Sequence, residues 1–471
     1  MPRTKIVATI GPASNSPARL EALIQAGMNV ARLNFSHGTP AEHGEVIRLI
    51  RRLAEQSGRP VAILQDLAGF KIRIGTIAAG TVRLKPGGSF TLTTRDIPGD
   101  ASGASISYPG LPKIVQPGDT LLLSDGALEL EVREKSDTDI RCRVVIGGPL
   151  SSHKGINLPA RRIDAAALTE KDQADLAFGI EQGVDYIGLS FVRGADDVAA
   201  AKRLIAARGA DTPLIAKIER QEALENIDAI VAAVDGIMVA RGDLGVEIPL
   251  QKVPLMQKML IDKANRAGKP VITATHMLRS MVSNRRPTRA EVADVANAIL
   301  DGTDAIMLSE ETAVGEYPIE AVEMMVQIAE DVETGFPFES WPRRFQSDSA
   351  RPVAEAVAHA ACQLAEDIDA AGIVTCTRSG STARLVAKHR TRRPIFALTP
   401  DPQTLRRLAL IWGVIPLRSE RMENTDAMID SAIRTVADTD LLSRPGTVVL
   451  TAGIPTATPG GTSLIRVAKL R

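Results

Sequence analysis

Charged and polar side chains recur at alternating positions in two short segments of the chain, where they could bind an anion. Arg32, Asn34 and Ser36 stand at i, i+2 and i+4 in the run Arg-Leu-Asn-Phe-Ser-His-Gly. Lys217 and Glu219 repeat this spacing in Lys-Ile-Glu. In an extended strand, alternate residues point to the same side. We therefore expect a guanidinium, an ammonium and several oxygen ligands to face one space.

A second carboxylate, Asp243, occurs in the run Ala-Arg-Gly-Asp-Leu-Gly. Together with Glu219 it suits Mg²⁺ or Mn²⁺, which keep several waters and take further ligands from an anionic substrate. Arg32 and Lys217 would bind phosphoryl oxygens or a developing enolate, and losing one such charge costs on the order of 3 kcal/mol in the barrier. Gly242 permits close backbone approach, so main-chain amides can receive a substrate carboxylate.

Each of these charged residues could also belong to a purely structural ion pair. A shared position in the predicted fold favours a functional site instead. Eight short apolar segments end in polar or charged residues, namely Lys5–Ile10, Asn29–Asn34, Val61–Asp66, Asp185–Phe191, Pro213–Ile218, Gly236–Ala240, Pro270–Thr275 and Ala305–Leu308. They predict a (β/α)₈ TIM barrel, in which the loops after the strands build the active site. The residues that would meet in one mouth are Arg32, Asp66, Lys217, Glu219, Asp243 and Thr275.

The spacing of the segments predicts three domains of an α/β protein. Residues 67–184 separate the third and fourth segments, far more than the roughly 2 to 6 residues of a βα loop. Short β segments cut by Pro-Gly turns fill this interval and predict an inserted small β-barrel lid at residues 70–164. The barrel domain would comprise residues 1–69 and 165–345. A new alternation of helices and strands predicts a C-terminal α/β sandwich at residues 346–471.

Composition excludes several classes of protein. Lys plus Arg and Asp plus Glu number 56 each among 471 residues, without long blocks of one sign, so neither nucleic acid nor a membrane surface is an expected partner. No apolar run approaches the roughly 18 residues of a membrane span, and the N-terminal apolar run is too short for a signal peptide, so we expect a cytoplasmic protein. The three cysteines lack C-x-x-C spacing and the six histidines form no pair at i, i+4, which argues against a zinc site.

The chain resembles the pyruvate kinase family over essentially its full length. The resemblance runs from Thr-Lys-Ile-Val-Ala-Thr-Ile-Gly-Pro-Ala-Ser at residues 4–14 to Thr-Ala-Gly-Ile-Pro at residues 451–455. It implies glycolytic transfer of the phosphoryl group of phosphoenolpyruvate to ADP, giving ATP and pyruvate after the enolate is protonated. No P-loop and no protein-kinase catalytic loop is present, so this chemistry would use the barrel mouth.

The resemblance also implies roles for particular residues. Those matching Glu219 and Asp243 hold the Mg²⁺ or Mn²⁺ ion, those matching Arg32 and Lys217 contact the transferring phosphoryl group, and the one matching Thr275 lies on the enolpyruvate side. Others match family positions on the nucleotide side, namely Asn34, His37, Arg73 and Lys154. Ser309 and Glu311 match positions near a proposed proton relay. The inserted module corresponds to a mobile lid that closes over ADP and excludes water.

The segment after Asp66 departs from the pattern of potassium-dependent members. Leu67 stands where they usually carry threonine, and Lys71 where they usually carry glutamate. Our hypothesis is that the Lys71 ammonium supplies the positive charge that K⁺ supplies elsewhere, so K⁺ is not required. The region in question comprises Asn34, Ser36, Asp66, Leu67 and Lys71. Three further residues depart from the family pattern: Phe70 stands where the family usually has proline, His276 where it has glutamine, and Glu310 where it has glycine. These departures bear on how the lid moves and on the optimum pH.

A polar loop in the last domain could bind phosphate. It lies between a predicted strand and a predicted helix and consists of Thr377, Arg378, Ser379, Gly380, Ser381 and Thr382. Hydroxyls and free helix N-terminal amides there could cradle a phosphate, although an ordinary helix cap would use the same residue types. The family places a sugar-phosphate effector in the matching loop, so the resemblance implies allosteric control by a phosphorylated metabolite. It also implies a homotetramer.

Two other functions are compatible with parts of this pattern. A metal-dependent lyase or aldolase of the barrel class would share the carboxylates and an enolate-stabilising arginine, but it has no need of the inserted module or the extra domain. A metabolite-sensing protein that had lost turnover would be expected to lack a metal carboxylate or a phosphoryl-binding cation. Glu219, Asp243, Arg32 and Lys217 are all present.

Overall fold

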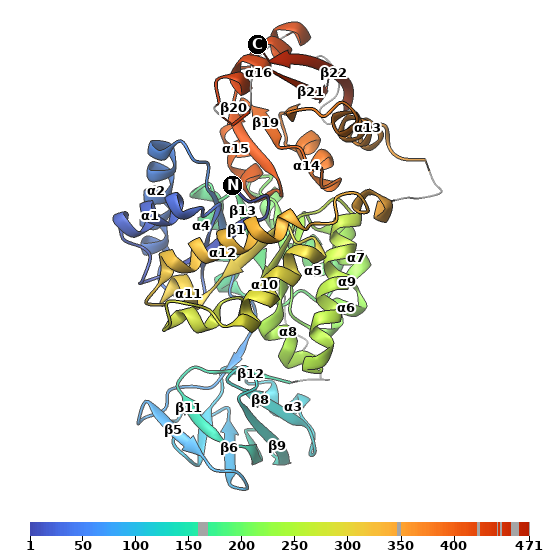
Figure 1. The fold of residues 1–471 in the computed structure, drawn as a ribbon. Helices are drawn as coiled ribbons and strands as arrows, with labels where there is room; N and C mark the ends of the chain where they lie inside the picture. The colour runs from blue at the N-terminus through green and yellow to red at the C-terminus, as the bar shows by residue number, and fades with distance from the viewer. Residues whose placement is uncertain are drawn as a thin grey trace.

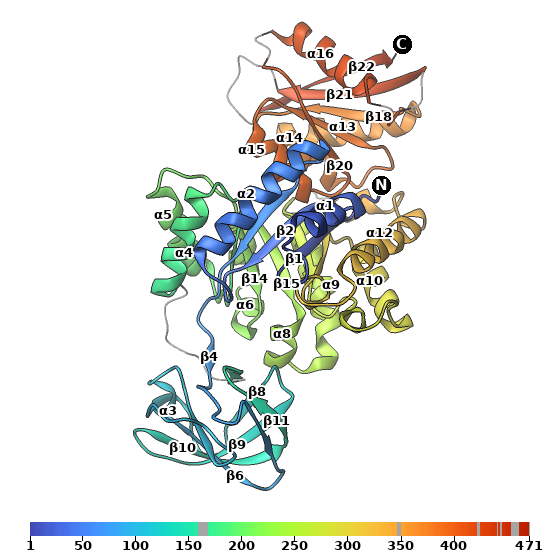
Figure 2. The same ribbon diagram turned by 90° about the vertical axis from the view of Figure 1, so that its left-hand side faces the viewer.

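The computed structural model describes residues 1–158, 168–345, 350–421, 424–439, 441–442, 445–453 and 461–470. Its three parts follow one another along the long axis of the molecule (Figures 1 and 2). The barrel lies in the middle, the inserted β module at one end and the C-terminal α/β part at the other. The predicted boundary between residues 164 and 165 lies outside the described residues, and the one between 345 and 346 borders an undescribed stretch.

The central part is a closed barrel of eight parallel strands, which confirms the predicted fold class. Around the barrel the strands follow the order β1, β17, β16, β15, β14, β13, β3 and β2. Their bounds are β1 Lys5–Ile10, β2 Val30–Asn34, β3 Ala62–Asp66, β13 Tyr186–Leu189, β14 Leu214–Ile218, β15 Gly236–Ala240, β16 Val271–Ala274 and β17 Ala305–Leu308. The largest difference from the sequence prediction is at β13, which ends at Leu189 and leaves Ser190 and Phe191 in the following loop.

Helices between and after these strands surround the barrel. They are α1 Pro17–Ala26, α2 Pro40–Ser57, α4 Glu170–Glu181, α5 Ala195–Ala206, α6 Gln221–Glu225, α7 Ile227–Ala233, α8 Arg241–Glu247, η1 Leu250–Lys252, α9 Val253–Arg266, η2 Arg279–Val282, α10 Arg289–Asp301, α11 Glu310–Ala313, α12 Pro318–Thr334 and η3 Trp341–Phe345. Capping boxes at Thr39, Thr169 and Thr288 start α2, α4 and α10. In each, the threonine hydroxyl and an acidic side chain three residues later satisfy otherwise free amides, which fixes where the helix begins.

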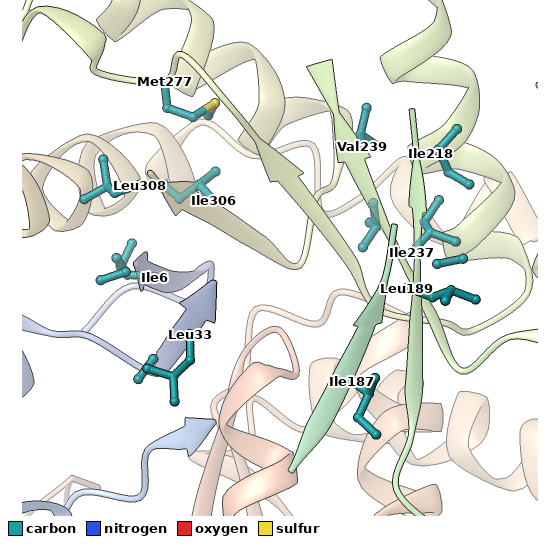
Figure 3. Close-up of a cluster of buried hydrophobic side chains, with 14 of the residues drawn as sticks. Ile6, Leu33, Ile187, Leu189, Ile218, Ile237, Val239, Met277, Ile306 and Leu308 are labelled. Carbon is teal, nitrogen blue, oxygen red and sulfur yellow. The ribbon is translucent and has the colours of Figure 1, made fainter. Parts of the chain in front are cut away.

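Alternating strand residues build two apolar layers. Outward-facing residues such as Ile6, Leu33 and Ile187 pack against the helices (Figure 3). Inward-facing residues such as Val7 fill the barrel itself, and this inner cluster also contains Ala409 and Leu410. These two residues belong to a short helix of the C-terminal part, η4 Leu408–Leu410. The C-terminal part therefore closes the barrel at the end where the strands begin.

The insertion is an all-β module with its own core, as the sequence predicts. Its elements are β4 Ile72–Arg73, β5 Thr81–Leu84, β6 Ser89–Thr93, β7 Gly103–Ser105, α3 Leu111–Ile114, β8 Thr120–Leu123, β9 Leu128–Lys135, β10 Asp139–Ile146, β11 Gly148–Ser151 and β12 Gly155–Asn157. Seven strands form one sheet in the order β4-β12-β8-β9-β10-β6-β7, and β11 pairs with β5 in a second sheet. The module lies beyond the end of the barrel where the strands terminate (Figure 1).

The C-terminal part is an open α/β sandwich. Its elements are α13 Val353–Asp367, β18 Gly372–Cys376, α14 Ser381–Lys388, β19 Ile395–Thr399, α15 Pro402–Arg407, η4, β20 Val414–Arg418, α16 Thr425–Ala437, β21 Gly446–Gly453 and β22 Thr462–Leu470. The sheet order is β20-β19-β18-β21-β22, with β22 antiparallel to β21. Sequence reasoning missed β20, which contains Pro416. A proline lacks an amide donor, and β20 accommodates it because it lies at the edge of the sheet.

Buried polar contacts join the C-terminal part to the barrel. Asp185 is fully buried and binds Arg51 at 2.8 Å and Arg406 of α15 at 2.9 Å. Arg390 pairs with Asp304 at 3.1 Å and lies over the ring of Trp412. Because removal of one partner would leave a buried charge unpaired, these contacts fix how the two parts dock. Among the described residues, no helix is long and apolar enough to cross a membrane.

Replacing Leu410 by alanine tests the closure of the barrel by the C-terminal part. Leu410 is 0% exposed, so the change should leave a cavity in the inner cluster and cost about 2–5 kcal/mol of unfolding free energy. Urea titration followed by circular dichroism would measure this loss. The matched control is Leu300→Ala on α10, where the side chain is 38% exposed and the expected change is within about 0.5 kcal/mol. Equal losses in the two variants would contradict the closure.

Candidate active site

The strands of the barrel end in one mouth that faces the inserted module (Figure 1). Arg32 comes from β2 and Asp66 is the last residue of β3. The Nε and Nη2 atoms of Arg32 both lie 2.7 Å from Asp66 Oδ2. Arg32 Nη1 donates to Thr9 Oγ1 at the end of β1, at 2.9 Å. The guanidinium predicted to bind phosphoryl oxygens is therefore oriented by two neighbouring strands.

The ammonium of Lys217, on β14, contacts three side-chain oxygens within the mouth. Its Nζ atom lies 3.2 Å from Asp66 Oδ1, 3.0 Å from Glu219 Oε1 and 2.7 Å from Ser190 Oγ. The lysine side chain is 12% exposed, and both carboxylates are 1% exposed. Asp66 thus binds Arg32 through one oxygen and Lys217 through the other.

This arrangement keeps Lys217 and Asp66 charged despite their burial. Burial would raise the pKa of Asp66, but Lys217 and Arg32 together hold that pKa below its ordinary value. Burial would lower the pKa of Lys217, but the neighbouring carboxylates, Asp66 first, raise it well above its ordinary value. Two fixed positive groups are therefore available to an anion that enters the mouth.

The two carboxylates predicted to hold a metal lie at the same mouth. Glu219 Oε2 accepts a hydrogen bond from the Phe191 amide at 2.6 Å. Asp243 lies in the first turn of α8 and receives Lys71 Nζ of the insertion at 2.8 Å. Burial, followed by the charge of Asp243, raises the pKa of Glu219, although Lys217 opposes this shift. A divalent cation between the carboxylates would favour their charged forms.

The side chains at the mouth fit Mg²⁺ better than a metal ion whose ligands all come from the protein. Within the described part of the chain, no group of three or more His, Cys, Asp or Glu side chains could hold a metal ion. Glu219 and Asp243 would therefore supply two ligands, and substrate oxygens and waters the remainder. Mg²⁺ is commonly bound in this way, through one or two carboxylates and the phosphates of its substrate.

Lys71, one residue of the predicted monovalent-cation region, contacts two carboxylates. Its ammonium is bonded to Asp243 at 2.8 Å and to Asp125 of the insertion at 3.2 Å. Of the four remaining residues, Asn34 Oδ1 accepts from the Ser36 amide at 3.2 Å, Asp66 binds the two cations, and the Leu67 side chain is buried. Asp243 and Asp125 raise the pKa of Lys71 against the effect of burial, so its charge is retained.

Thr275 and Gly242 pack against each other at the edge of the mouth. Thr275 directly follows β16 and has a φ of 76°, in the left-handed region. A Cβ atom on Gly242 would lie 2.7 Å from Thr275 Cγ2. Only glycine permits this approach, which brings the threonine beside the backbone at the start of α8.

Ser309 and Glu311 follow β17 at the same end of the barrel. The buried Glu311 carboxylate accepts the Ser309 amide at 2.7 Å and the Leu278 amide at 3.2 Å. These bonds hold the two loops after β16 and β17 together. The neighbouring Glu310 is exposed and pairs with Arg279 at 2.7 Å, while His276 is exposed with a φ of 56°.

The predicted nucleotide residues lie where the insertion meets the barrel. Arg73 Nη1 donates to His153 O at 3.1 Å, and Lys154, the next residue, is exposed. Burial, Arg73 and Arg32 lower the pKa of His37, so these cations act on the histidine electrostatically. The His37 amide binds Asn34 O at 3.2 Å.

Comparisons with known proteins agree with this geometry. The family model described as "Pyruvate kinase, barrel domain" matches residues 1–322, and the model "Pyruvate kinase, alpha/beta domain" matches residues 355–468. The chain belongs to the pyruvate kinase family. It is a phosphotransferase of that family.

Individual relatives cover nearly the whole chain. Pyruvate kinase 2 of Synechocystis is 49% identical over 470 residues, covering 99% of this chain and 79% of that protein. The Clostridium acetobutylicum pyruvate kinase is 44% identical and covers 99% of both chains. The crystal structure of a pyruvate kinase from Cryptosporidium parvum superposes with a TM-score of 0.93, at 37% identity, over 100% of this chain and 96% of that one.

The predicted effector loop of the chain lies at the opposite end of the barrel from the mouth. Gly380, with a φ of 80°, donates its amide to Thr377 Oγ1 at 2.9 Å, and Ser379 Oγ lies 3.2 Å from Ser381 Oγ. Thr382 Oγ1 bonds Thr462 Oγ1 at 2.7 Å. The loop borders a cleft of about 1640 Å³ between the α/β part and the barrel. Its basic lining residues include Arg378, Arg384, Arg407, Arg421, Lys202 and Lys269.

Sequence reasoning did not single out Thr9, Ser190 or Arg241 as functional. Thr9 orients Arg32, Ser190 binds Lys217, and Arg241 contacts the loop that carries Thr275. Ser190 directly follows the segment that forms β13, so the rule that site residues follow barrel strands could have found it. Thr9 lies inside β1, and only the side-chain contacts show its part in the mouth.

Replacing Ser190 by alanine tests whether the Lys217 ammonium must be held by three partners. One of its donors would lose its acceptor in a nearly closed site, so we expect steady-state phosphoryl transfer to fall by about 10- to 100-fold. The thermal unfolding midpoint should change little. The matched control is Ser280→Ala, which removes a hydroxyl bonded to Glu291 outside the mouth. Full activity of the Ser190 variant would show that Asp66 and Glu219 suffice.

Proposed function

We propose that this protein transfers the phosphoryl group of phosphoenolpyruvate to ADP, using Mg²⁺ held by Glu219 and Asp243. The observation that carries the proposal is the pair of cations, Arg32 and Lys217, held by one buried carboxylate beside two further carboxylates. Membership of the pyruvate kinase family supports the same reaction.

The residues of the mouth would divide the work between binding and charge stabilisation. Bound Mg²⁺ would neutralise oxygens of the substrate and of the transferring group. Arg32 and Lys217 would meet the charge that develops as the phosphoryl group leaves and the enolate forms. Main-chain amides at Gly242 and Asp243 would receive the substrate carboxylate. Thr275 would lie on the enolate side, near the position to be protonated, with Ser309 close by.

The insertion would act as a lid over the nucleotide. Asn34 and His37 from the barrel and Arg73 and Lys154 from the insertion would bind ADP between them. Polar contacts join the two parts within the described residues; for example, Asn157 Nδ2 lies 3.4 Å from Glu247 Oε1, and Lys71 Nζ lies 2.8 Å from Asp243 Oδ1. Such contacts favour movement of one part relative to the other. Closure would exclude water that could otherwise hydrolyse the activated phosphoryl group.

We further propose that Lys71 makes the reaction independent of K⁺. Its ammonium is 17% exposed and lies in the mouth on Asp243. A divalent ion at Asp243 would compete for the same carboxylate and leave the ammonium free to act on the anionic substrate. A covalently attached cation of this kind would supply the charge that an exchangeable ion supplies elsewhere.

Turnover with and without K⁺ tests the role of Lys71. We would measure pyruvate formation with Mg²⁺ in sodium-free buffer, comparing KCl with tetramethylammonium chloride at equal ionic strength. The unmodified enzyme should be equally fast in both salts, whereas Lys71→Glu should lose at least about 10-fold without K⁺ and recover when K⁺ is added. Lys85→Glu, at an exposed position of the insertion, is the control. A strong K⁺ requirement of the unmodified enzyme would refute the role of Lys71 and leave the kinase reaction intact.

We also propose that a phosphorylated metabolite controls a tetrameric enzyme through the loop at residues 377–382. The polar loop, the start of α14 and the arginines of the adjoining cleft support binding of a phosphate. Thr404 of α15 bonds the Arg378 carbonyl at 2.9 Å, and Arg406 of the same helix reaches Asp185 of the barrel. Effector binding would thereby act on an element that is docked on the barrel.

A combined Ser379→Ala and Ser381→Ala variant tests the effector loop. Two hydroxyl groups that could donate hydrogen bonds to phosphate would be lost. The concentration of sugar phosphate or nucleotide needed for half-maximal activation should therefore rise by about 10-fold or more. Activity without effector should be unchanged, and Ser57→Ala on α2 is the control. Unchanged activation by every phosphorylated metabolite that activates the unmodified enzyme would exclude this loop.

A further inference from the structure

All five N–H donors of the Arg241 guanidinium are engaged, although this residue belongs to none of the predicted catalytic or binding sets. Nε donates to Ala274 O at 3.2 Å, and Nη2 donates to Thr275 O at 2.8 Å and to the Met277 sulfur. Nη1 donates to Gln257 Oε1 at 3.1 Å and to Asp294 Oδ1 at 2.7 Å. An arginine offers five donors in a rigid plane, so full use of them fixes its position closely.

Most of these contacts converge on one short segment. Ala274, Thr275 and Met277 belong to the end of β16 and the loop after it, and two of the acceptors are successive backbone carbonyls. Arg241 is itself the first residue of α8, two positions before Asp243. One side chain therefore ties the start of α8 to the loop after the neighbouring strand.

The segment that Arg241 holds has an unfavourable backbone conformation. Thr275 and His276 are consecutive residues with φ values of 76° and 56°. A β-branched residue such as threonine rarely adopts a positive φ, and such a conformation persists only where its surroundings enforce it. The Arg241 bonds to the carbonyls of Ala274 and Thr275 orient the peptide units on both sides of the Thr275 Cα atom.

We propose that Arg241 is a positioning residue for phosphoryl transfer. It holds Thr275 in the left-handed conformation, in which the threonine side chain packs over Gly242 at the edge of the mouth. Without the guanidinium, Thr275 relaxes to a negative φ, and its side chain leaves the Gly242 backbone. The inference rests on the role proposed above for Thr275 on the enolate side of the substrate.

The contact pattern distinguishes this role from that of an ordinary structural ion pair. Asp294, the one charged partner, is 40% exposed, whereas the guanidinium is 12% exposed. An exposed carboxylate contributes little to stability, since solvent screens the pair. The three acceptors of the segment at residues 274–277 bind the guanidinium through donors that are fixed in one plane. A lysine at position 241 could not reach all three at once, because an ammonium lacks this planar arrangement of donors.

Arg241→Lys is the first test. We expect kcat to fall by about 100-fold, since a displacement of roughly 1 Å at a reacting group has that effect, while the KM for ADP stays within about twofold. Arg51→Lys is the matched control. Arg51 also donates to two backbone carbonyls and pairs with one aspartate, but it lies at the other end of the barrel. We expect its kcat to be unchanged and its thermal unfolding midpoint to fall at least as far as that of Arg241→Lys.

A double-mutant cycle with Thr275→Ala shows whether Arg241 acts through Thr275. If it does, Arg241→Lys slows the Thr275→Ala enzyme by less than about 10-fold, because the positioned group is already missing. Additive losses would overturn the proposal, as would equal kcat values for Arg241→Lys and the unmodified enzyme. A Thr275→Ala enzyme with full activity would instead refute the proposed role of Thr275, and the Arg241 proposal would fall with it.

Discussion

The mouth of the barrel depends on one buried carboxylate that binds two cations. Asp66 is 1% exposed and accepts Arg32 through one oxygen and Lys217 through the other. Burial alone would lower the pKa of Lys217 and raise that of Asp66, and the opposite charges around each of them reverse both shifts. Because Arg32, Asp66 and Lys217 come from β2, β3 and β14, closure of the barrel is what brings the three together. The electrostatics of the site are therefore a property of the closed sheet.

The two ends of the barrel have different partners, and polar contacts connect them. At one end, Leu410 of the α/β part completes the inner apolar layer, and Arg406 of α15 binds Asp185 immediately before β13. At the other end, β13 is followed by Ser190, which binds Lys217. A single strand of four residues thus separates an interdomain ion pair from the serine that binds Lys217. Propagation of a signal along it would require two discrete arrangements of α15 on the barrel.

The sequence predicts the barrel and the membership of its mouth well, because both follow from strand periodicity and from the position of polar residues after buried strands. It predicts individual side-chain contacts poorly. Lys71, for example, binds Asp243 of α8, a contact that its position in the sequence does not predict. The several contacts of Arg241 reach from α8 to β16, α9 and α10. No spacing within one segment contains such information.

A cation carried on the insertion differs physically from a dissolved one. A dissolved ion occupies its site according to its concentration, whether or not the enzyme is closed. If the insertion moves as a lid, the Lys71 charge moves with it, since Lys71 immediately precedes β4. On the proposed role, delivery of the charge and closure of the lid are one event. The cation would then be strongest over the substrate when water is excluded, because a charge acts more strongly at low dielectric constant. An enzyme that uses the Lys71 ammonium in place of K⁺ would thereby need one binding step fewer. The effect of the positive charge would then depend on lid movement.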